Sequence, residues 1–289
     1  MEKLLDTSCG ATRHMRIASA QIRCEVGNVP ANLRTIRRMS EQAKVQGAEW
    51  LVFPEMSDLG YVMEVIQSEA CTWTEGAVPE LQAMAKKLSL GIICGVSERA
   101  DGAIFNSQVV IDGDGTIIGK YRKTHLFAVE PVCEEKCFRR GDTLGCASLG
   151  EVRAGLTICY DLRFPELYRA LVSGCSPQLF LLSSAWPASR IEHLTVLATA
   201  RAIENQSYFV VANRAGSDGR AKFGGSSMIV DPSGVVLARA GAEEEQLLCA
   251  EISPERVTEV RERMPVLEHR RTDILPASPM TIDEPACVS

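Results

Sequence analysis

The stretch AGLTICYDLRFPELYR, residues 154–169, contains a short apolar run, a thiol and the start of a helix. Residues 154–160 have the length and apolar character of a buried strand, and Pro165 is typical of the first turn of a helix. The chain therefore leaves a strand near Cys159 and then enters a helix. In open α/β sheets, ligands bind where strands end in this way, so this unit predicts both a fold class and a site.

The same order of strand and helix repeats on both sides of this stretch. Short apolar runs bounded by Gly, Pro or Asp alternate with segments of helical periodicity. Strands are expected at 16–22, 50–53, 91–96, 154–160, 179–186 and 208–214, and helices at 31–46, 79–88, 165–172 and 191–206. This order predicts an α/β fold in which helices cover the sheets.

Two segments break the alternation in the same way. FNSQVVIDGDGTIIGKYRK (105–123) and GGSSMIVDPSGVVLARAG (224–241) each hold two strand-like runs joined by a turn that contains glycine. We therefore expect two similar halves, each closed by an antiparallel hairpin, with two sheets packed face to face and helices outside. One domain over residues 15–273 is expected, with an extension over 1–14 and a tail over 274–289.

Charge and composition exclude several classes of partner. The 31 basic and 37 acidic residues leave a formal charge of −6, which offers no Coulomb attraction to nucleic acid or anionic lipid. No apolar stretch approaches the ~20 residues that span a bilayer, and residues 1–14 lack the apolar run of a secretion signal. A cytoplasmic protein that acts on a small molecule is expected.

The cysteines suggest a reducing compartment. All 11 are scattered between Cys9 and Cys287 without the spacing of a disulfide framework, so most are expected to be free thiols. Cys133 and Cys137 could form a metal clip with His125, but there is no CxxC pair and the chain has only 4 histidines. A closed zinc site needs four ligands, so no metal is expected.

Two polar residues stand at other strand ends. Glu55 directly follows the apolar run WLVF and a proline, where ligands of α/β folds bind, although a solvated or helix-capping carboxylate has the same position. Lys123 ends the first hairpin beside two other cations. In a dry pocket its ammonium would stabilise a developing oxyanion far better than in water, whereas a solvated basic face explains the cluster equally well.

Cys159 has the position of a nucleophile at a strand–helix junction. A helix dipole and nearby cations would favour its thiolate, and a small buried hydrophobic residue is the alternative. Thiol-dependent amide hydrolysis needs a nucleophile, a group that moves its proton and an electrophile for the oxyanion. Cys159 could be the nucleophile, Glu55 the group that moves its proton and Lys123 the electrophile. A histidine-dependent thiol protease is less well supported, because two of the four histidines lie near the polar ends of the chain.

Three segments in order resemble the signatures of one superfamily. FPEMSDLGY (53–61), YRKTHLF (121–127) and ICYDLRFPELYR (158–169) are similar to the signature segments of the nitrilase, or carbon–nitrogen hydrolase, superfamily. The similarity extends from about Met15 to about Asp273. It implies a four-layer αββα sandwich, usually assembled as a homodimer or larger homo-oligomer, and a hydrolase that needs no cofactor.

The resemblance also assigns roles. It implies that Glu55 is the general base, that Lys123 stabilises the oxyanion and that Cys159 forms an acyl-enzyme that water hydrolyses. The backbone N–H of Tyr160 would complete the oxyanion hole, where one donor can be worth ~3 kcal/mol. A second glutamate supports the lysine in such enzymes, and the pattern EEKCFRRGD (134–142) places it at Glu134, with the next residue, also a glutamate, as the alternative.

Other residues follow the catalytic segments closely. Pocket-lining residues are expected at Tyr61, Phe127, Trp186 and Arg190. Core packing would explain the aromatic residues as well, and Arg190 either binds a substrate carboxylate bidentately or lies at a solvent-facing helix start. Residues expected to brace the site, with helix-face salt bridges and caps as the alternative, are Arg163, Glu166, Glu204 and Asn205.

The substrate follows from the combination of motifs. CYDLRFPELYR with SSAWP and VVANRAG is most similar to the ω-amidase-type branch, which deamidates dicarboxylic acid monoamides such as 2-oxoglutaramate. A deaminated-glutathione amidase and an N-carbamoyl amine hydrolase are the alternatives, whereas nitrile hydrolysis is disfavoured because Tyr160, not tryptophan, follows the cysteine. The loop FAVEPVCEEKCF (127–138) is expected near the site entrance. A catalytically inactive metabolite-binding module is the alternative of another class.

Overall fold

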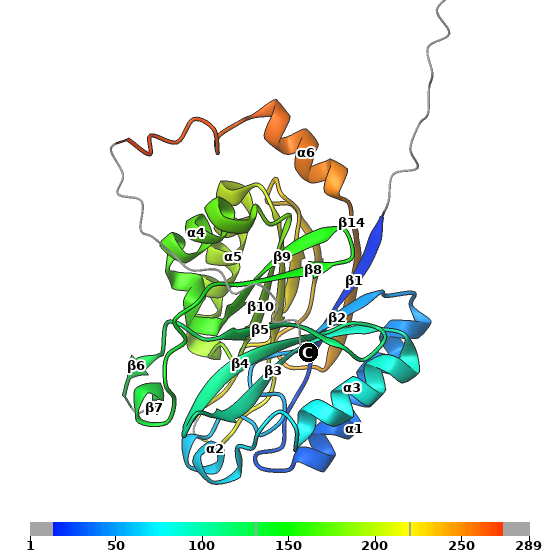
Figure 1. Ribbon diagram of the computed structural model, residues 1–289, viewed down its shortest axis with the longest axis vertical. Helices are drawn as coiled ribbons and strands as arrows, with labels where there is room; N and C mark the ends of the chain where they lie inside the picture. The colour runs from blue at the N-terminus through cyan, green and yellow to red at the C-terminus, as the bar shows by residue number, and fades with distance from the viewer. Residues whose placement is uncertain (1–13, 131, 220, 274–289) are drawn as a thin grey trace, which may run out of the picture.

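The computed structural model describes residues 14–130, 132–219 and 221–273, whose strands form two six-stranded sheets and one short ribbon (Figure 1). The first sheet contains β1 (Met15–Gln21), β2 (Trp50–Val52), β3 (Gly91–Ala100), β4 (Ala103–Ile111), β5 (Ile117–Arg122) and β14 (Gln246–Ile252). The second contains β8 (Gly145–Leu149), β9 (Val152–Ile158), β10 (Leu179–Ser184), β11 (Tyr208–Asn213), β12 (Met228–Val230) and β13 (Val236–Arg239). The ribbon is β6 (Ala128–Val129) and β7 (Val132–Cys133).

The helices occupy the connections between these strands. They are α1 (Val29–Val45), α2 (Met63–Glu69), α3 (Ala77–Leu88), α4 (Pro165–Cys175), α5 (Ile191–Asn205) and α6 (Pro254–Arg263). Three short 3₁₀ turns cover Glu134–Lys136, Cys159–Arg163 and Ala188–Arg190. The predicted helix start at Pro165 is confirmed, whereas α2 was not expected.

The two sheets are built alike. In each, three neighbouring parallel strands are followed by an antiparallel hairpin: β1, β2 and β3 with β4–β5, and β9, β10 and β11 with β12–β13. Both hairpin turns have a glycine at positive φ, Gly115 at 90° and Gly234 at 88°, where a Cβ would cause strain. The predicted halves and their hairpins are therefore confirmed.

Each sheet is completed by a strand from the other half. After β5 the chain crosses over and forms β8, which pairs antiparallel with β9. After β13 it crosses back and forms β14, which pairs antiparallel with β1. Neither of these strands was expected from the sequence, and together they join the halves into one unit.

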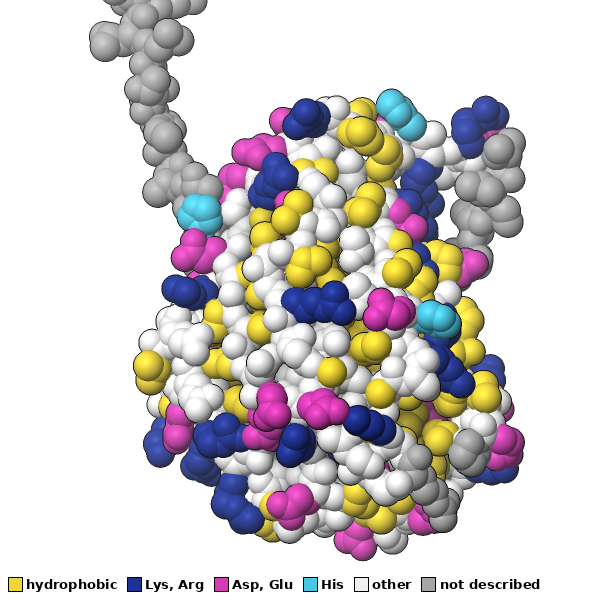
Figure 2. All heavy atoms as spheres, turned by 180° about the vertical axis from the view of Figure 1, so that it is seen from behind, with side chains coloured by type: hydrophobic (Ala, Val, Ile, Leu, Met, Phe, Trp, Pro, Cys, Tyr) yellow, Lys and Arg dark blue, Asp and Glu magenta, His cyan; other side chains and the backbone are white. Residues whose placement is uncertain are grey.

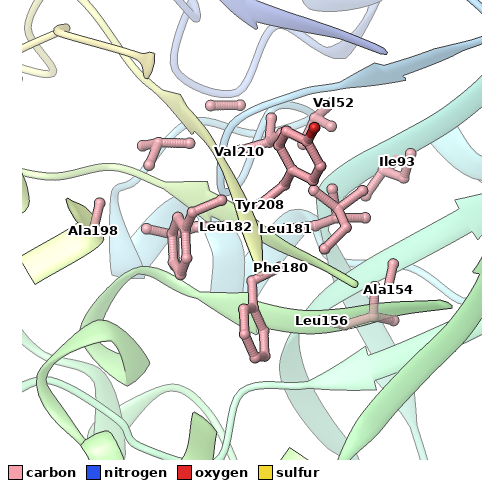
Figure 3. Close-up of a cluster of buried hydrophobic side chains, with 14 of the residues drawn as sticks. Val52, Ile93, Ala154, Leu156, Phe180, Leu181, Leu182, Ala198, Tyr208 and Val210 are labelled. Carbon is pink, nitrogen blue, oxygen red and sulfur yellow. The ribbon is translucent and has the colours of Figure 1, made fainter. Parts of the chain in front are cut away.

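The four-layer αββα arrangement is confirmed. Figure 1 shows α1 and α3 on one side of the two sheets and α4 and α5 on the other. Between the sheets, Val52 and Ile93 face Leu181, while the next residue of β10, Leu182, lies on the side of Ala198 in α5 (Figure 3). The parallel strands at the centre of each sheet are therefore buried on both faces, which is why they are continuous apolar runs in the sequence.

Strand ends bring the candidate residues to one edge of the sandwich. Glu55 follows β2, Lys123 follows β5, Cys159 follows β9 and Ala185 follows β10. The expected extension over 1–14 and tail over 274–289 lie outside the described residues except for His14, so those domain boundaries stay predictions. Among the described helices, none is both long and apolar enough to cross a membrane. Figure 2 shows side chains of both charges interspersed on the rear face.

Candidate active site

Lys123 lies at the centre of a buried charged cluster. Its Nζ is 2.8 Å from Oε1 of Glu55 and 2.9 Å from Oε1 of Glu134, and the three side chains have no exposed surface. Of the two adjacent glutamates, Glu134 is the one that contacts Lys123, whereas Glu135 is exposed and pairs with Arg140. With both carboxylates ionised, the cluster carries a net charge of −1.

The carboxylates keep the ammonium charged. Burial lowers the pKa of Lys123, but attraction to Glu134 and Glu55 outweighs it, so this pKa lies above the ordinary value for lysine. Burial raises the pKa of Glu134 above that of an ordinary glutamate; Lys123 opposes this change and Glu55 adds to it. At neutral pH the cluster therefore holds a permanent cation beside two crowded carboxyl groups.

Further donors fix the position of Glu55. The side chain of Asn106 donates from Nδ2 to Glu55 Oε1 at 2.7 Å, and the backbone N–H of Ala185 donates to Oε2 at 2.9 Å. The same Nδ2 of Asn106 also donates to Glu134 Oε1 at 3.2 Å, and the backbone carbonyl of Asn106 accepts a hydrogen bond from the backbone N–H of Lys123. Sequence reasoning missed Asn106, because an amide in the middle of a hairpin strand has no motif around it.

Glu134 is held from the cavity side. Tyr61 donates its hydroxyl to Oε1 at 2.7 Å, and the backbone N–H of Phe127 donates to Oε2 at 2.6 Å. Tyr61 was expected only as a pocket-lining residue. Its hydroxyl instead contacts the charged cluster directly, so one side chain belongs both to the pocket and to the Lys123 environment.

Cys159 sits at a sharp turn where β9 ends. Its φ of 43° is strained for a residue with a Cβ, and the sulfur-bearing side chain is buried, with 9% of the residue exposed. The buried carboxylate of Asp161 holds this turn, since it accepts hydrogen bonds from the Ile158 N–H at 2.9 Å, the Tyr121 hydroxyl at 2.8 Å and the His125 N–H at 3.1 Å. Asp161 therefore ties the turn of the thiol to the segment that carries the lysine.

The expected low pKa of Cys159 is wrong. Burial raises the pKa of Cys159 above its ordinary value of 9.0, and Glu55 raises it further, while Lys123 and donors on Ser184 and Ala185 compensate only in part. The nearest regular α-helix begins only at residue 165, and the nearby ammonium is shared with two carboxylates. Cys159 is therefore a thiol at neutral pH, and a base must take its proton during any nucleophilic attack.

This protonation state predicts slow labelling of Cys159 at neutral pH. Only the thiolate reacts with N-ethylmaleimide, so the labelling rate should rise about tenfold per pH unit from pH 7 to pH 9, because the pKa lies above that range. Peptide mass mapping of the labelled chain measures the labelling of Cys159 separately from that of the other thiols. A rate that levels off below pH 8 would contradict the raised pKa.

The thiol opens into a cavity of about 1040 Å³. All four expected pocket residues line it, namely Tyr61, Phe127, Trp186 and Arg190. The cavity is also lined by three residues of the turn that carries the thiol, Cys159, Tyr160 and Arg163. The Arg163 guanidinium lies 4.7 Å from the centre of the Trp186 ring, and that of Arg190 lies 5.7 Å from the centre of the Phe127 ring. The loop 127–138 contributes several residues to the cavity wall, as expected.

The other bracing residues lie elsewhere. Glu204 pairs with Arg201 at 2.8 Å, and Asn205 donates to the Arg201 carbonyl, so both act within α5. Glu166 is exposed in the first turn of α4. For these three residues the helix-face alternative is correct, and only Arg163 reaches the cavity.

Cys133, Cys137 and His125 were weighed above as a metal clip and rejected. The three side chains contact different partners: Cys133 contacts Glu130, Cys137 contacts the Met63 carbonyl, and His125 contacts Asp161. Within residues 14–130, 132–219 and 221–273, no group of three or more His, Cys, Asp or Glu side chains is arranged to hold a metal ion.

Comparison with known proteins places this geometry in a family. Residues 16–262 match the profile of the family described as carbon-nitrogen hydrolase. The 2-oxoglutaramate amidase of Bacillus subtilis is 37% identical, over 78% of this chain and 86% of the relative. The deaminated glutathione amidase of Synechocystis is 34% identical, over 84% and 93%. The crystal structure of Saccharomyces cerevisiae Nit3, a member of the nitrilase superfamily, superposes with a TM-score of 0.81 at 27% identity, over 90% of this chain and 97% of that one.

Proposed function

This chain belongs to the carbon–nitrogen hydrolase family, and on that basis we propose that it is an ω-amidase-type enzyme that hydrolyses a dicarboxylic acid monoamide to the acid and ammonia. One observation carries the proposal. The Lys123 ammonium contacts Glu55 and Glu134, the charges of Lys123 and Glu55 act on the thiol of Cys159, and Cys159 lines the cavity. This arrangement supplies a nucleophile, a base and an electrophile without any further group.

In the first step, the Cys159 sulfur attacks the amide carbon while Glu55 takes the thiol proton. This coupling is needed because the thiol is protonated at neutral pH. The carbonyl oxygen becomes an oxyanion that faces the Lys123 ammonium and the Tyr160 N–H. Each such donor is worth ~3 kcal/mol of transition-state stabilisation in a site that excludes water.

In the second step, Glu55 returns the proton to the amide nitrogen, ammonia leaves and a thioester remains on Cys159. Glu55 then takes a proton from a water molecule that attacks the thioester, and the acid is released as the thiol is restored. Throughout, Glu134 is a support for Lys123, 2.9 Å from its Nζ, rather than a reacting group, because Glu55 and not Glu134 is the carboxylate whose charge raises the pKa of the Cys159 thiol.

The arginines on the cavity wall are the binding site that we propose for the second carboxylate of the substrate. Lys136 and Lys222 also line the cavity, but they pair with Glu130 and Glu243. In the part of the chain that the structure describes, Arg163 and Arg190 have no carboxylate partner. A planar guanidinium binds a carboxylate through two parallel hydrogen bonds, which fixes the orientation of a dicarboxylic monoamide.

Cavity size favours a second candidate, a deaminated-glutathione amidase. At about 1040 Å³, the cavity lies at the upper end of the ~300–1,000 Å³ typical of drug-sized ligand sites. A five-carbon monoamide fills only a small part of such a volume, whereas a substrate derived from a tripeptide fills much more. The relative from Synechocystis carries that activity in its name.

A substrate panel separates these candidates. We expect the highest kcat/KM with 2-oxoglutaramate, lower values with deaminated glutathione and N-carbamoyl amines, and none with nitriles. Arg190→Gln should raise KM about 10–100-fold for 2-oxoglutaramate, the loss of a hydrogen-bonded charge pair, without changing KM for a neutral amide such as butyramide. A preference for deaminated glutathione would transfer the assignment to the second candidate. Hydrolysis of no substrate in the panel would favour the inactive binding module.

We also propose a cytoplasmic homodimer or larger homo-oligomer. All nine cysteines of the described residues are free thiols, in keeping with a reducing compartment. Exposed apolar residues of α5 and the β12–β13 hairpin support self-association: Val196, Ile203, Val235, Val236 and Leu237. Light scattering should give at least twice the chain mass, and Val196→Glu with Ile203→Glu should lower it to one chain. A wild-type monomer at micromolar concentration would refute the proposal.

A further inference from the structure

A buried ion pair lies beside the candidate site but outside the charged cluster. Arg214 follows β11 and has a fully buried side chain, and the side chain of Asp218 is 2% exposed. The two form a bidentate pair, with Nη1 to Oδ2 at 2.6 Å and Nη2 to Oδ1 at 2.7 Å. A buried pair of this kind seldom stabilises a fold more than apolar residues of the same shape do, so its presence calls for another explanation.

Both members of the pair hold Tyr61. The same Oδ2 of Asp218 accepts the backbone N–H of Tyr61 at 2.8 Å. The Arg214 guanidinium lies 4.4 Å from the centre of the Phe223 ring, and this ring meets the Tyr61 ring edge-on, with centres 6.4 Å apart. Tyr61 is thus fixed at its backbone and at its ring, and each contact leads back to Arg214.

The fixed hydroxyl of Tyr61 reaches the lysine cluster. It donates to Glu134 Oε1 at 2.7 Å, the same oxygen that accepts from Lys123 Nζ at 2.9 Å. A displaced Tyr61 would release this oxygen and let the ammonium move away from the thiol. A shift of about 1 Å in such a group can lower a rate by about 100-fold, even when the cause lies far from the chemistry.

We propose that Arg214 and Asp218 are positioning residues that act through Tyr61 and Glu134 on the ammonium of Lys123. The inference rests on the proposed function for its catalytic consequence, but the contacts exist independently of the substrate. The pair belongs to the second half of the chain, whereas Tyr61 belongs to the first half, so the pair also sets how the two halves meet at the site.

The test is a double-mutant cycle between Asp218→Asn and Tyr61→Phe. Asparagine keeps the shape of the side chain but has only one oxygen. It cannot replace both carboxylate oxygens of Asp218, which accept from the Arg214 guanidinium and from the Tyr61 N–H. We expect each single variant to lower kcat about 10–100-fold with KM changed less than threefold, and the double variant to be no slower than the slower single one. Effects on kcat that multiply would overturn the proposal, because Asp218 would then act without Tyr61.

A second measurement needs no turnover. Lys123 lowers the pKa of Cys159, so a loosened ammonium should slow N-ethylmaleimide labelling of that thiol at pH 8.5 at least threefold in each single variant, with no further loss in the double variant. A wild-type chain that hydrolyses no amide would refute the proposed function and leave this coupling measurable. Unchanged labelling in both single variants would overturn the coupling itself.

Two controls separate positioning from a loss of stability. Asp231 is a buried carboxylate in the β12–β13 turn that pairs with Arg256 of α6 at 3.3 Å. Asp231→Asn should lower Tm without changing kcat or the labelling rate of Cys159. Arg214→Lys keeps the charge but loses the bidentate geometry, so it is used in the same cycle if Asp218→Asn does not fold. It should give the same lack of additivity with Tyr61→Phe.

Discussion

Cys159→Ser is expected to abolish amide hydrolysis while leaving the fold intact, with kcat lowered by a factor on the order of 10⁴–10⁶. The raised pKa of the thiol already makes attack depend on proton transfer to Glu55. A serine hydroxyl is a far weaker acid, so the same carboxylate cannot activate it. Ammonia release measures the rate, and mass spectrometry of the wild type during turnover should detect the thioester on the peptide that contains Cys159.

Cys94→Ser is the matched control for this experiment. Cys94 is fully buried in the core on the outer face of the first sheet and takes no part in the cavity. Its replacement places an extra polar group in an apolar site, so it should lower the free energy of unfolding by about 1–3 kcal/mol and leave kcat unchanged. Activity of Cys159→Ser within tenfold of the wild type would refute the nucleophile.

Lys123→Met is expected to have the second largest effect, because it damages both catalysis and stability. It removes the cation that we propose faces the oxyanion, which should lower kcat at least 10³-fold. It also leaves two buried carboxylates without a counter-charge, and breaking a buried pair in this way costs about 3–5 kcal/mol of folding free energy. Activity assays and urea unfolding measure the two losses separately.

The stability loss of Lys123→Met should depend on pH in a defined direction. The pKa of Glu134 is already raised above the ordinary 4.5 in the wild type, even though the Lys123 ammonium lowers it. Removal of the ammonium therefore raises the pKa of Glu134 further. A carboxyl group with a raised pKa is most favourable to the folded state when protonated, so the deficit is largest at pH 7–8 and shrinks as pH falls toward 4.5. A deficit that grows on acidification would contradict the cluster.

A compensating change separates the two roles of the lysine. Lys123→Met combined with Glu134→Gln removes one of the two uncompensated charges, so it should recover part of the lost stability at neutral pH. It should recover no activity, because the oxyanion still lacks its cation. Recovery of turnover would show that Lys123 acts only as a structural counter-ion.

Much of the fold could be predicted because its signals are local. The parallel strands are buried on both faces and are therefore continuous apolar runs, and both hairpins have glycine turns. Strands β8 and β14 escaped prediction for a physical reason. Each is an edge strand that pairs with the other half of the molecule, β14 is only half-buried along most of its length, and pairing between distant segments leaves no local pattern.

The candidate site was predictable where residues have motifs and not where they act through distant contacts. Glu55, Lys123 and Cys159 each follow a recognisable strand, so their meeting at one edge could be expected. Asn106 bridges two carboxylates from the middle of a strand, and Asp218 contacts Tyr61, which lies 157 residues earlier in the sequence. The thiol pKa was predicted in the wrong direction, because the sequence shows neither the complete burial of the thiol nor that Glu55 acts on it more strongly than Lys123 does.

The exchange of β8 and β14 has a consequence for biosynthesis. Residue 15 pairs with residue 252, so β1 has an unpaired edge until residue 252 has left the ribosome. An exposed, apolar strand edge invites pairing with other nascent chains, and contacts between such distant residues form slowly. We therefore expect chains that stop before residue 246 to aggregate rather than to accumulate as a folded first half, which pulse-labelling of truncated chains can measure. The order of synthesis thus makes the last strand the step that commits the chain to its native structure.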